Sequence, residues 1–253
     1  MTAAAAFVGA VAAAGSLAYW QGDLADAGRS YEAALAIDRE LGDPARIGDD
    51  LRNLGFVAMV TRDIPAAVRL FGEAVEHLEA TGDRFALAEA RASYGVSLAL
   101  SGDPAGARGY LEASCAVMLE LGVLARAADN ANALGIIHRR LGNMAAAISM
   151  SRQALELVDQ LGDAIRTPFM LDSAAALALE RGKTVDAVRI ASAAAHLRTT
   201  IGGALPNFFD DIGALMATAR MTLGDSAYDD AWAAGQTLDV DAALRDGLAT
   251  LAE

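Results

Sequence analysis

The chain has 253 residues, of which 54% are hydrophobic and only 6% aromatic, and its formal net charge is −13 at pH 7. Because a negatively charged surface repels phosphate groups, this charge argues against direct binding to nucleic acid. The single cysteine, Cys115, excludes an intramolecular disulfide. An aromatic-poor composition rich in alanine favours closely packed helices and predicts an all-α fold.

The first twenty residues are apolar enough to resemble an export signal or a membrane span. A signal peptide needs a positively charged start, and no Lys or Arg precedes Arg29. Gly15 also falls in register with a repeat that runs through most of the chain. We therefore expect this stretch to be a helix of that repeat and the protein to be cytoplasmic, without membrane association; a targeting segment is the alternative.

The repeat has a period of 40 residues, which is typical of arrays built from helical hairpins. Small residues recur at two positions of each unit, where they let two helices approach closely, and a larger residue follows the second position by four. We expect this larger residue to fill the space between neighbouring hairpins. These positions are Gly15, Gly55, Gly95 and Gly135, then Ala27, Ala67, Ala107, Ala147 and Ala187, then Tyr31, Phe71 and Leu111.

Turn signals fall every 20 residues, as at Gly22-Asp23, Gly42-Asp43 and Gly102-Asp103. Glycine suits the left-handed position that ends a helix, and the Asp or Asn that follows it can cap the next helix. The spacing predicts ten helices of roughly 16 to 18 residues, paired into five hairpins. The units cover about 4–43, 44–83, 84–123, 124–163 and 164–203, so the array spans 1–203.

Residues 204–253 lose the period and are expected to form a C-terminal helical cap, as terminal units of a solenoid do. Leu205-Pro206 predicts the start of a helix that runs to about Leu223. A turn at Gly224-Asp225 and a short helix to Gly235 follow. Leu238-Asp239 then caps a last helix.

Leu54-Gly55, Ala67, Phe71 and Ala74 match the signature spacing of the tetratricopeptide repeat, and the chain resembles this family. The resemblance implies an α-α superhelix of about five hairpins, a solenoid whose first helices line a concave face. The period of 40 is longer than the ~34 residues usual for the family. A variant with longer helices accounts for the difference.

The C-terminal region carries a second resemblance, to the tetratricopeptide-type ends of MalT-like and LuxR-associated bacterial regulatory ATPases. The residues that carry it are Leu223-Gly224, Tyr228, Ala231-Trp232, Gly235, Leu238-Asp239 and Ala243-Leu244, together with Leu41-Gly42-Asp43 and Leu161-Gly162-Asp163. In that family the array senses a ligand or partner and restrains an ATPase module. This chain contains neither that module nor a DNA-binding domain, so those activities are not carried over.

Gly182-Lys183-Thr184 resembles the end of a phosphate-binding loop. Such a loop needs a glycine five residues before its second glycine, and that position is Leu177. The motif also occupies the position of the other turns. We interpret it as a turn and predict no nucleotide cofactor.

The three histidines are spread along the chain and lack the spacing of a zinc site. His77 and His138 occupy columns that are otherwise apolar, which favours core or groove-edge positions, whereas His196 aligns with solvated glutamates. Cys115 aligns with aliphatic residues, so we expect it in the core. The sequence therefore predicts no metal, no catalytic residues and no enzymatic activity.

By the tetratricopeptide resemblance, a groove lined by first helices is expected to bind an extended peptide or an amphipathic helix. Phe56, Met59 and Ile136 are the expected apolar anchors, while Arg52 and Arg139 meet charges on the partner. A basic or mixed-charge partner is expected because the groove has more carboxylates than bases. The predicted lining is Asp49, Arg52, Phe56, Met59, Glu89, Asp129, Asn132, Ile136, Arg139, Phe169 and Asp172.

The sequence thus favours a non-catalytic protein–protein interaction or scaffold module, the sensor region of a bacterial transcriptional regulator. A small-ligand receptor of the same fold is the alternative, and a solvated helix face without a ligand is a second one. An open apolar end of a repeat array is costly in water. We therefore expect a second copy of the chain or an upstream module to cover the first helix.

Overall fold

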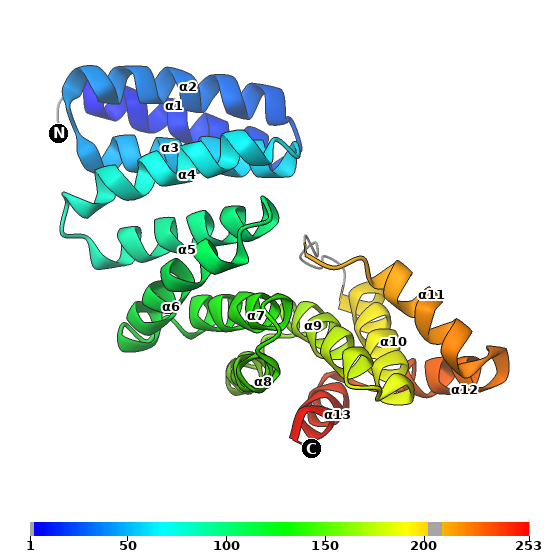
Figure 1. The fold of residues 1–253 in the computed structure, drawn as a ribbon. Helices are drawn as coiled ribbons and strands as arrows, with labels where there is room; N and C mark the ends of the chain where they lie inside the picture. The colour runs from blue at the N-terminus through cyan, green and yellow to red at the C-terminus, as the bar shows by residue number, and fades with distance from the viewer. Residues whose placement is uncertain (1–2, 202–208, 253) are drawn as a thin grey trace. The chain divides into compact units, whose positions relative to one another are not determined.

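The structure is a computed structural model that describes residues 3–201 and 209–252, without the side chains of residues 3–6. Every regular element in this described part is an α-helix, and successive helices form hairpins (Figure 1). The all-α prediction is confirmed. The helices are α1 (Ala3–Trp20), α2 (Leu24–Leu41), α3 (Pro44–Val60), α4 (Ile64–Glu79), α5 (Arg84–Leu100), α6 (Pro104–Glu120), α7 (Leu124–Arg140), α8 (Met144–Leu161), α9 (Thr167–Glu180), α10 (Thr184–Ile201), α11 (Ile212–Leu223), α12 (Asp225–Gly235) and α13 (Val240–Ala252).

The turns between hairpin helices follow the predicted chemistry. Gly42 has φ 68° and its N–H donates to Arg39 O, after which the Asp43 carboxylate accepts from Ala45 N and caps α3. Left-handed glycines end the helices at most of the expected positions, and Arg62, with φ 65°, is the non-glycine residue that does so among the described residues. Asn143 differs from the expectation because its side chain makes no capping hydrogen bond.

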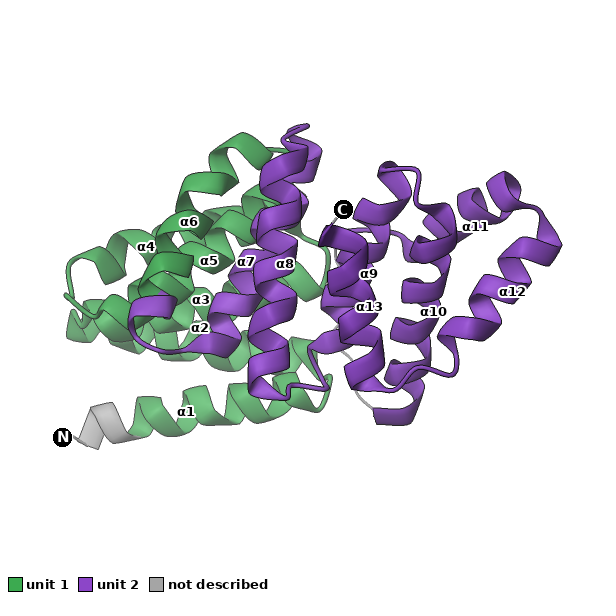
Figure 2. Ribbon diagram, turned by 90° about the horizontal axis from the view of Figure 1, so that it is seen from below, with its two compact units in different colours: residues 1–117 green, residues 118–253 purple. Residues whose placement is uncertain are grey.

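The chain forms two compact units, residues 1–117 and 118–253, each described by itself (Figure 2). This division falls inside α6, whereas the sequence suggested an array to residue 203 and a separate cap. Within the second unit, α11 and α13 pack on α9 and α10, and α12 packs on α10. The C-terminal helices therefore share a core with the last hairpins.

In unit 1, α3 packs against α2, α4 and α5, so the α3–α4 hairpin is held between its neighbours. Phe71 of α4 is fully buried, and a Cβ added at Gly55 of α3 would lie 2.6 Å from the ring. Its core cluster extends to Val96 and Leu100 of α5. The glycine thus makes room for a large side chain inside the hairpin, and the cluster around that side chain reaches the next hairpin, as predicted.

In unit 2, α13 packs against α8, α9 and α10, and α12 packs against α10. The predicted ends of the short helix and the start of the last helix are confirmed by α12 and α13. The helix expected from Leu205-Pro206 begins instead at Ile212, where the Asp211 side chain accepts from Ala214 N. Leu205-Pro206 itself lies outside the described residues.

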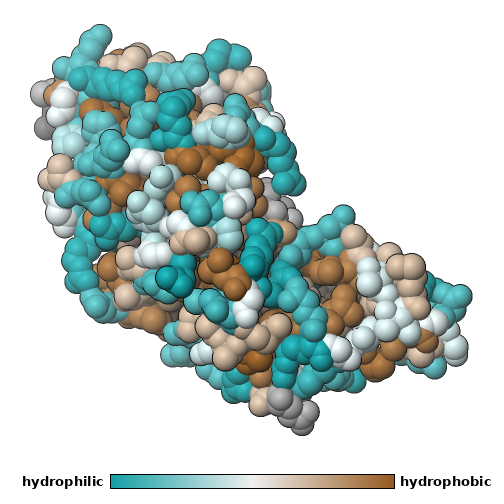
Figure 3. Space-filling view, viewed as in Figure 1, coloured by the Kyte–Doolittle hydropathy of each residue, from teal (hydrophilic) through white to brown (hydrophobic). Residues whose placement is uncertain are grey.

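Large apolar side chains reach the surface at the first helix. Phe7, Leu17 and Trp20 are 62%, 61% and 84% exposed, and α1 contains no charged residue. Elsewhere, on the face drawn in Figure 3, apolar residues form separate patches bordered by polar ones. The second tryptophan, Trp232, is half-buried and stacks on Tyr228 with ring centroids 5.8 Å apart. None of the helices in residues 3–201 and 209–252 is both long and apolar enough to cross a membrane.

Candidate functional site

A hollow of about 300 Å³ lies between the first helices of the first two hairpins, α1 and α3. Its apolar side comes from α1, and its polar side from the end of α2 and from α3. Two of the residues predicted for the groove, Asp49 and Arg52, line it. The complete lining is Val8, Gly9, Ala12, Asp38, Arg46, Asp49, Asp50, Arg52 and Asn53.

Two carboxyl groups meet at the polar side of this hollow. Asp38 is 2% exposed and Asp50 is 3% exposed, and the charge of Asp38 acts on the Asp50 carboxyl. Burial raises the pKa of Asp50 to about 7, and the negative charge of Asp38 adds to the effect, while Arg46 lowers it. At neutral pH Asp50 therefore carries a proton part of the time, which reduces its repulsion with the neighbouring carboxyl.

Both arginines of the hollow are paired with carboxylates of the chain. Arg46 Nη1 lies 3.6 Å from Asp38 Oδ1, and Arg52 Nη1 donates to Glu89 Oε2 at 3.4 Å. Arg52 Nη2 also reaches Asp49 Oδ1 at 3.5 Å. Since these contacts are long and the Asp49 side chain is 54% exposed, Asp49 is the accessible charge of the group.

The other predicted groove residues of unit 1 are less accessible. Met59 is 8% exposed and Glu89 is 9% exposed, and Glu89 contacts Arg52 across the α3–α5 interface. Phe56 is half-buried, with its ring 5.2 Å from that of Phe71. The structure therefore brings Asp49, Arg52 and Glu89 together, whereas Phe56 and Met59 belong to the neighbouring core.

In unit 2, Asp129 of α7 is central to an ionic cluster. Arg166 donates to Asp129 Oδ1 through Nε at 3.0 Å and to Asp163 Oδ2 through Nη1 at 2.7 Å. Burial raises the pKa of Asp129, and Arg166 partly offsets this effect. The pKa of Asp163 is lowered: its burial acts in the opposite direction but is outweighed by its hydrogen bonds with Arg166.

Arg139 is engaged by the chain itself. It donates to Glu180 Oε1 at 2.5 Å and to both oxygens of Asp210 at 2.6 and 2.7 Å, and its side chain is 9% exposed. The segment after the undescribed residues 202–208 thus lies over α7, where Arg140 also donates to Phe209 O. A partner carboxylate would have to displace Asp210 to reach Arg139.

Three further groove residues lie inside unit 2. Asn132 is fully buried, and Ile136 and Asp172 are each 1% exposed. Asp172 is held by Arg198 of α10. Phe169 is half-buried. Contact of any groove residue with a partner stays a prediction, but the buried ones would act by shaping the surface above them.

The Gly182-Lys183 motif forms a turn, and Cys115 lies in the core. Gly182 has φ 77° in a helix-ending turn, and Lys183 Nζ donates to Thr250 O of α13. Cys115 is 6% exposed, and burial raises the pKa of its thiol. His77, His138 and His196 are all half-buried.

Sequence reasoning missed the Asp38–Asp50 pair and the partners of Arg139. A signal for the pair is present in the repeat: Asp38 occupies the column of Leu78, Met118 and Val158, which are all buried. A carboxylate in an apolar column is unusual and marks a special environment. Asp210 follows the last repeat, so no column of the repeat could have identified it.

Comparisons with known proteins agree with this architecture. A family model described as "Tetratricopeptide repeat" matches residues 131–165. A search of curated proteins gave no match.

Three solved structures share the fold. BtubC (BKLC) from P. vanneervenii is 20% identical, with a TM-score of 0.66 over 81% of this chain and 84% of BtubC. Aspartyl phosphate phosphatase F from Bacillus subtilis is 12% identical, with a TM-score of 0.63 over 90% of this chain and 62% of the phosphatase. The apo form of RapI is 13% identical, with a TM-score of 0.58 over 93% of this chain and 72% of RapI. The chain thus has the fold of a tetratricopeptide-type helical array, and it spans less than two thirds of phosphatase F.

Proposed function

We propose that the chain is a non-catalytic protein-interaction module that binds a basic or mixed-charge peptide on the face formed by its first helices. The supporting observation is the hollow between α1 and α3, where Asp38, Asp49 and Asp50 outnumber the two arginines, each already close to a carboxylate. Exposed Asp49 can receive a Lys or Arg side chain. The net charge of −13 favours the same partners. The similarity to phosphatase F concerns the fold, and no phosphatase activity is transferred.

Selection of peptides from a phage-displayed random dodecamer library tests this proposal. Selected peptides should be enriched in Lys and Arg, and Asp49→Lys should weaken their binding by about tenfold because it reverses the accessible charge. Glu112→Lys is the matched control, since Glu112 is similarly exposed on α6. Equal binding by the wild type and Asp49→Lys, or selection of peptides without basic residues, would contradict the proposal.

A small-ligand receptor is the second candidate, because the hollow combines a buried carboxyl pair with an apolar wall. A ligand that binds only the folded state raises its melting temperature. A thermal-shift screen with small primary amines and amino acids addresses this candidate. A rise in melting temperature that the Asp50→Asn variant no longer shows would favour a small-ligand receptor over a peptide-binding module.

We further infer that the module serves as the sensor region of a cytoplasmic bacterial transcriptional regulator, in line with the second sequence resemblance. The test is the mass of the native protein in its source cell, detected with an antibody to this region. A band far above 26.0 kDa, in the cytoplasmic fraction, is expected if the module belongs to a larger regulator. A band at 26.0 kDa would instead indicate a free-standing adaptor.

A further inference from the structure

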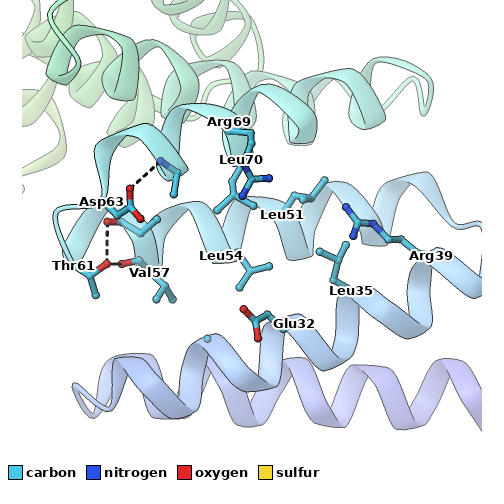
Figure 4. Close-up of a pocket in the computed structure, with 13 residues that line it drawn as sticks. Glu32, Leu35, Arg39, Leu51, Leu54, Val57, Thr61, Asp63, Arg69 and Leu70 are labelled. Atoms are coloured by element: carbon cyan, nitrogen blue, oxygen red, sulfur yellow. Dashed lines mark hydrogen bonds between the residues drawn. The ribbon is translucent and has the colours of Figure 1, made fainter.

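A second surface lies on the side of the second helices, in a groove between α2 and α4 with α3 as its floor (Figure 4). The volume of this α2–α4 groove is about 430 Å³. Leu51, Leu54 and Val57 of α3 form an apolar floor, flanked by Leu35 of α2 and Leu70 of α4. Charged and polar residues form the rim: Glu32, Arg39, Thr61, Asp63 and Arg69.

The equivalent place one repeat later has a different lining and a somewhat smaller hollow. Tyr94 and Tyr110 stand 40 residues after Leu54 and Leu70, and their rings pack edge to face with centroids 4.8 Å apart. The equivalent of Leu51 is Arg91, which donates to Glu79 of α4 at 3.0 Å. The hollow that remains beside Tyr110 is about 330 Å³. The two grooves therefore differ in their lining residues, because the first groove has leucines at positions where the next repeat has tyrosines and an arginine.

Three repeats later, the equivalent groove contains a helix of the chain itself. α13 packs on α8, α9 and α10, and lies beside α8 and α9 in Figure 2. Its Gly247 lies against Leu155 and Leu171, where an added Cβ would be 3.4 and 3.0 Å from their methyl groups. Leu155 and Leu171 stand 120 residues after Leu35 and Leu51 of the α2–α4 groove.

One ionic contact of α13 also has a counterpart in the first groove. Asp246 accepts two hydrogen bonds from Arg189, at 2.6 and 2.7 Å. Arg189 stands 120 residues after Arg69, whose side chain is 62% exposed and bonds to Glu73. The exposed Arg69 can therefore bind a carboxylate of a partner helix as Arg189 binds Asp246 of α13.

We propose that the α2–α4 groove binds an amphipathic helix of a partner protein, seated as α13 is seated between α8 and α10. This surface is separate from the face of the first helices and does not rest on the function proposed there. The partner helix should present a small residue over Leu35 and Leu51, and an Asp or Glu toward Arg69. The ridge that α13 buries shows the pattern: Ala243, Leu244, Gly247, Thr250 and Leu251.

The α2–α4 groove and the groove that contains α13 differ in charge at one end. Thr250 O, in the last turn of α13, accepts from Arg181 Nη1 at 3.1 Å and from Lys183 Nζ at 3.0 Å. The equivalents in the first groove are Thr61 and Asp63, which supply no cation. A bare helix C-terminus is disfavoured beside an Asp. The partner's last turn should therefore carry Lys or Arg.

The position of that base can be inferred from the pocket beside α13. Ala252 lines this pocket together with Arg152 of α8. Glu32 stands 120 residues before Arg152, so a Lys at the position of Ala252 would face Glu32 in the first groove. The matching probe is an acetylated and amidated peptide of residues 236–252 carrying Ala252→Lys.

A fluorescently labelled form of this peptide should bind the full-length protein, as measured by fluorescence anisotropy. Its affinity should be about fivefold higher than that of the 236–252 peptide without the Lys. The intramolecular α13 keeps its own groove occupied because its effective concentration is in the range of about 1 mM. Filling the first groove with Leu54→Tyr and Leu70→Tyr, as in the next repeat, should weaken binding by about tenfold or more. Met221→Tyr on α11, 79% exposed, is the matched control.

A charge exchange provides a test that leaves the core untouched. Arg69→Glu should weaken the Lys-bearing peptide, and a further peptide change of Asp246→Lys should restore its affinity. Circular dichroism checks that each variant is folded. If the double tyrosine variant does not fold, the charge exchange alone tests the proposal. Absence of peptide binding at about 1 mM, equal affinity for the filled variant, or failure of the exchange to restore binding would overturn the proposal.

Discussion

Asp50 shows at the scale of one residue how the hollow between α1 and α3 depends on pH. Its folded-state pKa of about 7 lies above the value of an unfolded Asp, so the folded protein holds the proton more tightly. The stability linked to this proton is fully present below the unfolded pKa and is lost as the pH rises through the folded pKa. Asp38, Asp49 and Arg46 are the charged groups that act on it.

We therefore expect the unfolding free energy of the wild type, relative to Asp50→Asn, to fall between about pH 4 and pH 7 and to level off above. A shift of this size corresponds to about 4 kcal/mol. Urea unfolding at a series of pH values measures the difference. Glu112→Gln, a change at an exposed carboxylate of α6, is the control and should keep the pH dependence. A difference between wild type and Asp50→Asn that stays constant with pH would show that the carboxyl pair is not protonated as described.

At the scale of an element, the C-terminal helices are attached through glycines as well as ion pairs. Gly235, at the end of α12, lies so close to α10 that an added Cβ would be 2.2 Å from Arg189 O. The same contact is held by Ser192 Oγ, which donates to Trp232 O at 2.6 Å. Because the obstacle is backbone, it cannot be relieved by turning a side chain.

Gly235→Ala is accordingly expected to lower the unfolding free energy by about 2–3 kcal/mol, by forcing α12 away from α10. Gly109→Ala on α6 is the matched control, because nothing lies within 4 Å of its added Cβ. That control should be neutral or stabilising by about 0.5–1 kcal/mol, as alanine favours a helix over glycine. Chemical denaturation of the two variants measures both effects, and equal stability would contradict the close approach.

At the scale of the whole molecule, each hairpin contacts mainly its neighbours, so damage should stay local. Leu78 in unit 1 and Leu171 in unit 2 are 1% and 0% exposed. Truncation of either to Ala should cost about 2–5 kcal/mol. Opening should then increase most in the unit that carries the change.

Hydrogen exchange followed by mass spectrometry can test this expectation. Leu78→Ala should accelerate exchange mainly within residues 1–117, and Leu171→Ala mainly within 118–253. Each variant serves as the control of the other. A uniform increase along the whole chain in both variants would indicate that the two units unfold together.

The sequence predicted the hairpins because their information is local and repeated every 40 residues. A turn glycine, a capping Asp and a small–large pair specify each hairpin within one unit. The position of α13 could not be predicted in the same way, since it depends on a groove formed by three earlier helices. The engagement of Arg139 by Asp210 also joins residues 71 positions apart, outside any repeat register.

The candidate sites show the same difference between local information and contacts with distant residues. Asp49 and Arg52, two of the predicted groove residues, lie beside a hollow because both lie on a helix whose face follows from the repeat, and their contact with a partner stays a prediction. Burial of Asn132, Ile136 and Asp172 results from neighbours that the signature does not encode. A comparison of equivalent positions in successive repeats would have singled out the α2–α4 groove, because its leucines align with tyrosines in the next repeat.

The two tryptophans have a practical consequence, because one lies in each unit. Trp20 is almost fully exposed on α1 and should emit like indole in water, whereas half-buried Trp232, stacked on Tyr228, should emit at shorter wavelength. Replacing either with Phe leaves a natural optical reporter for a single unit. Melting curves and ligand titrations can therefore be assigned to the N-terminal or the C-terminal half without attaching a dye.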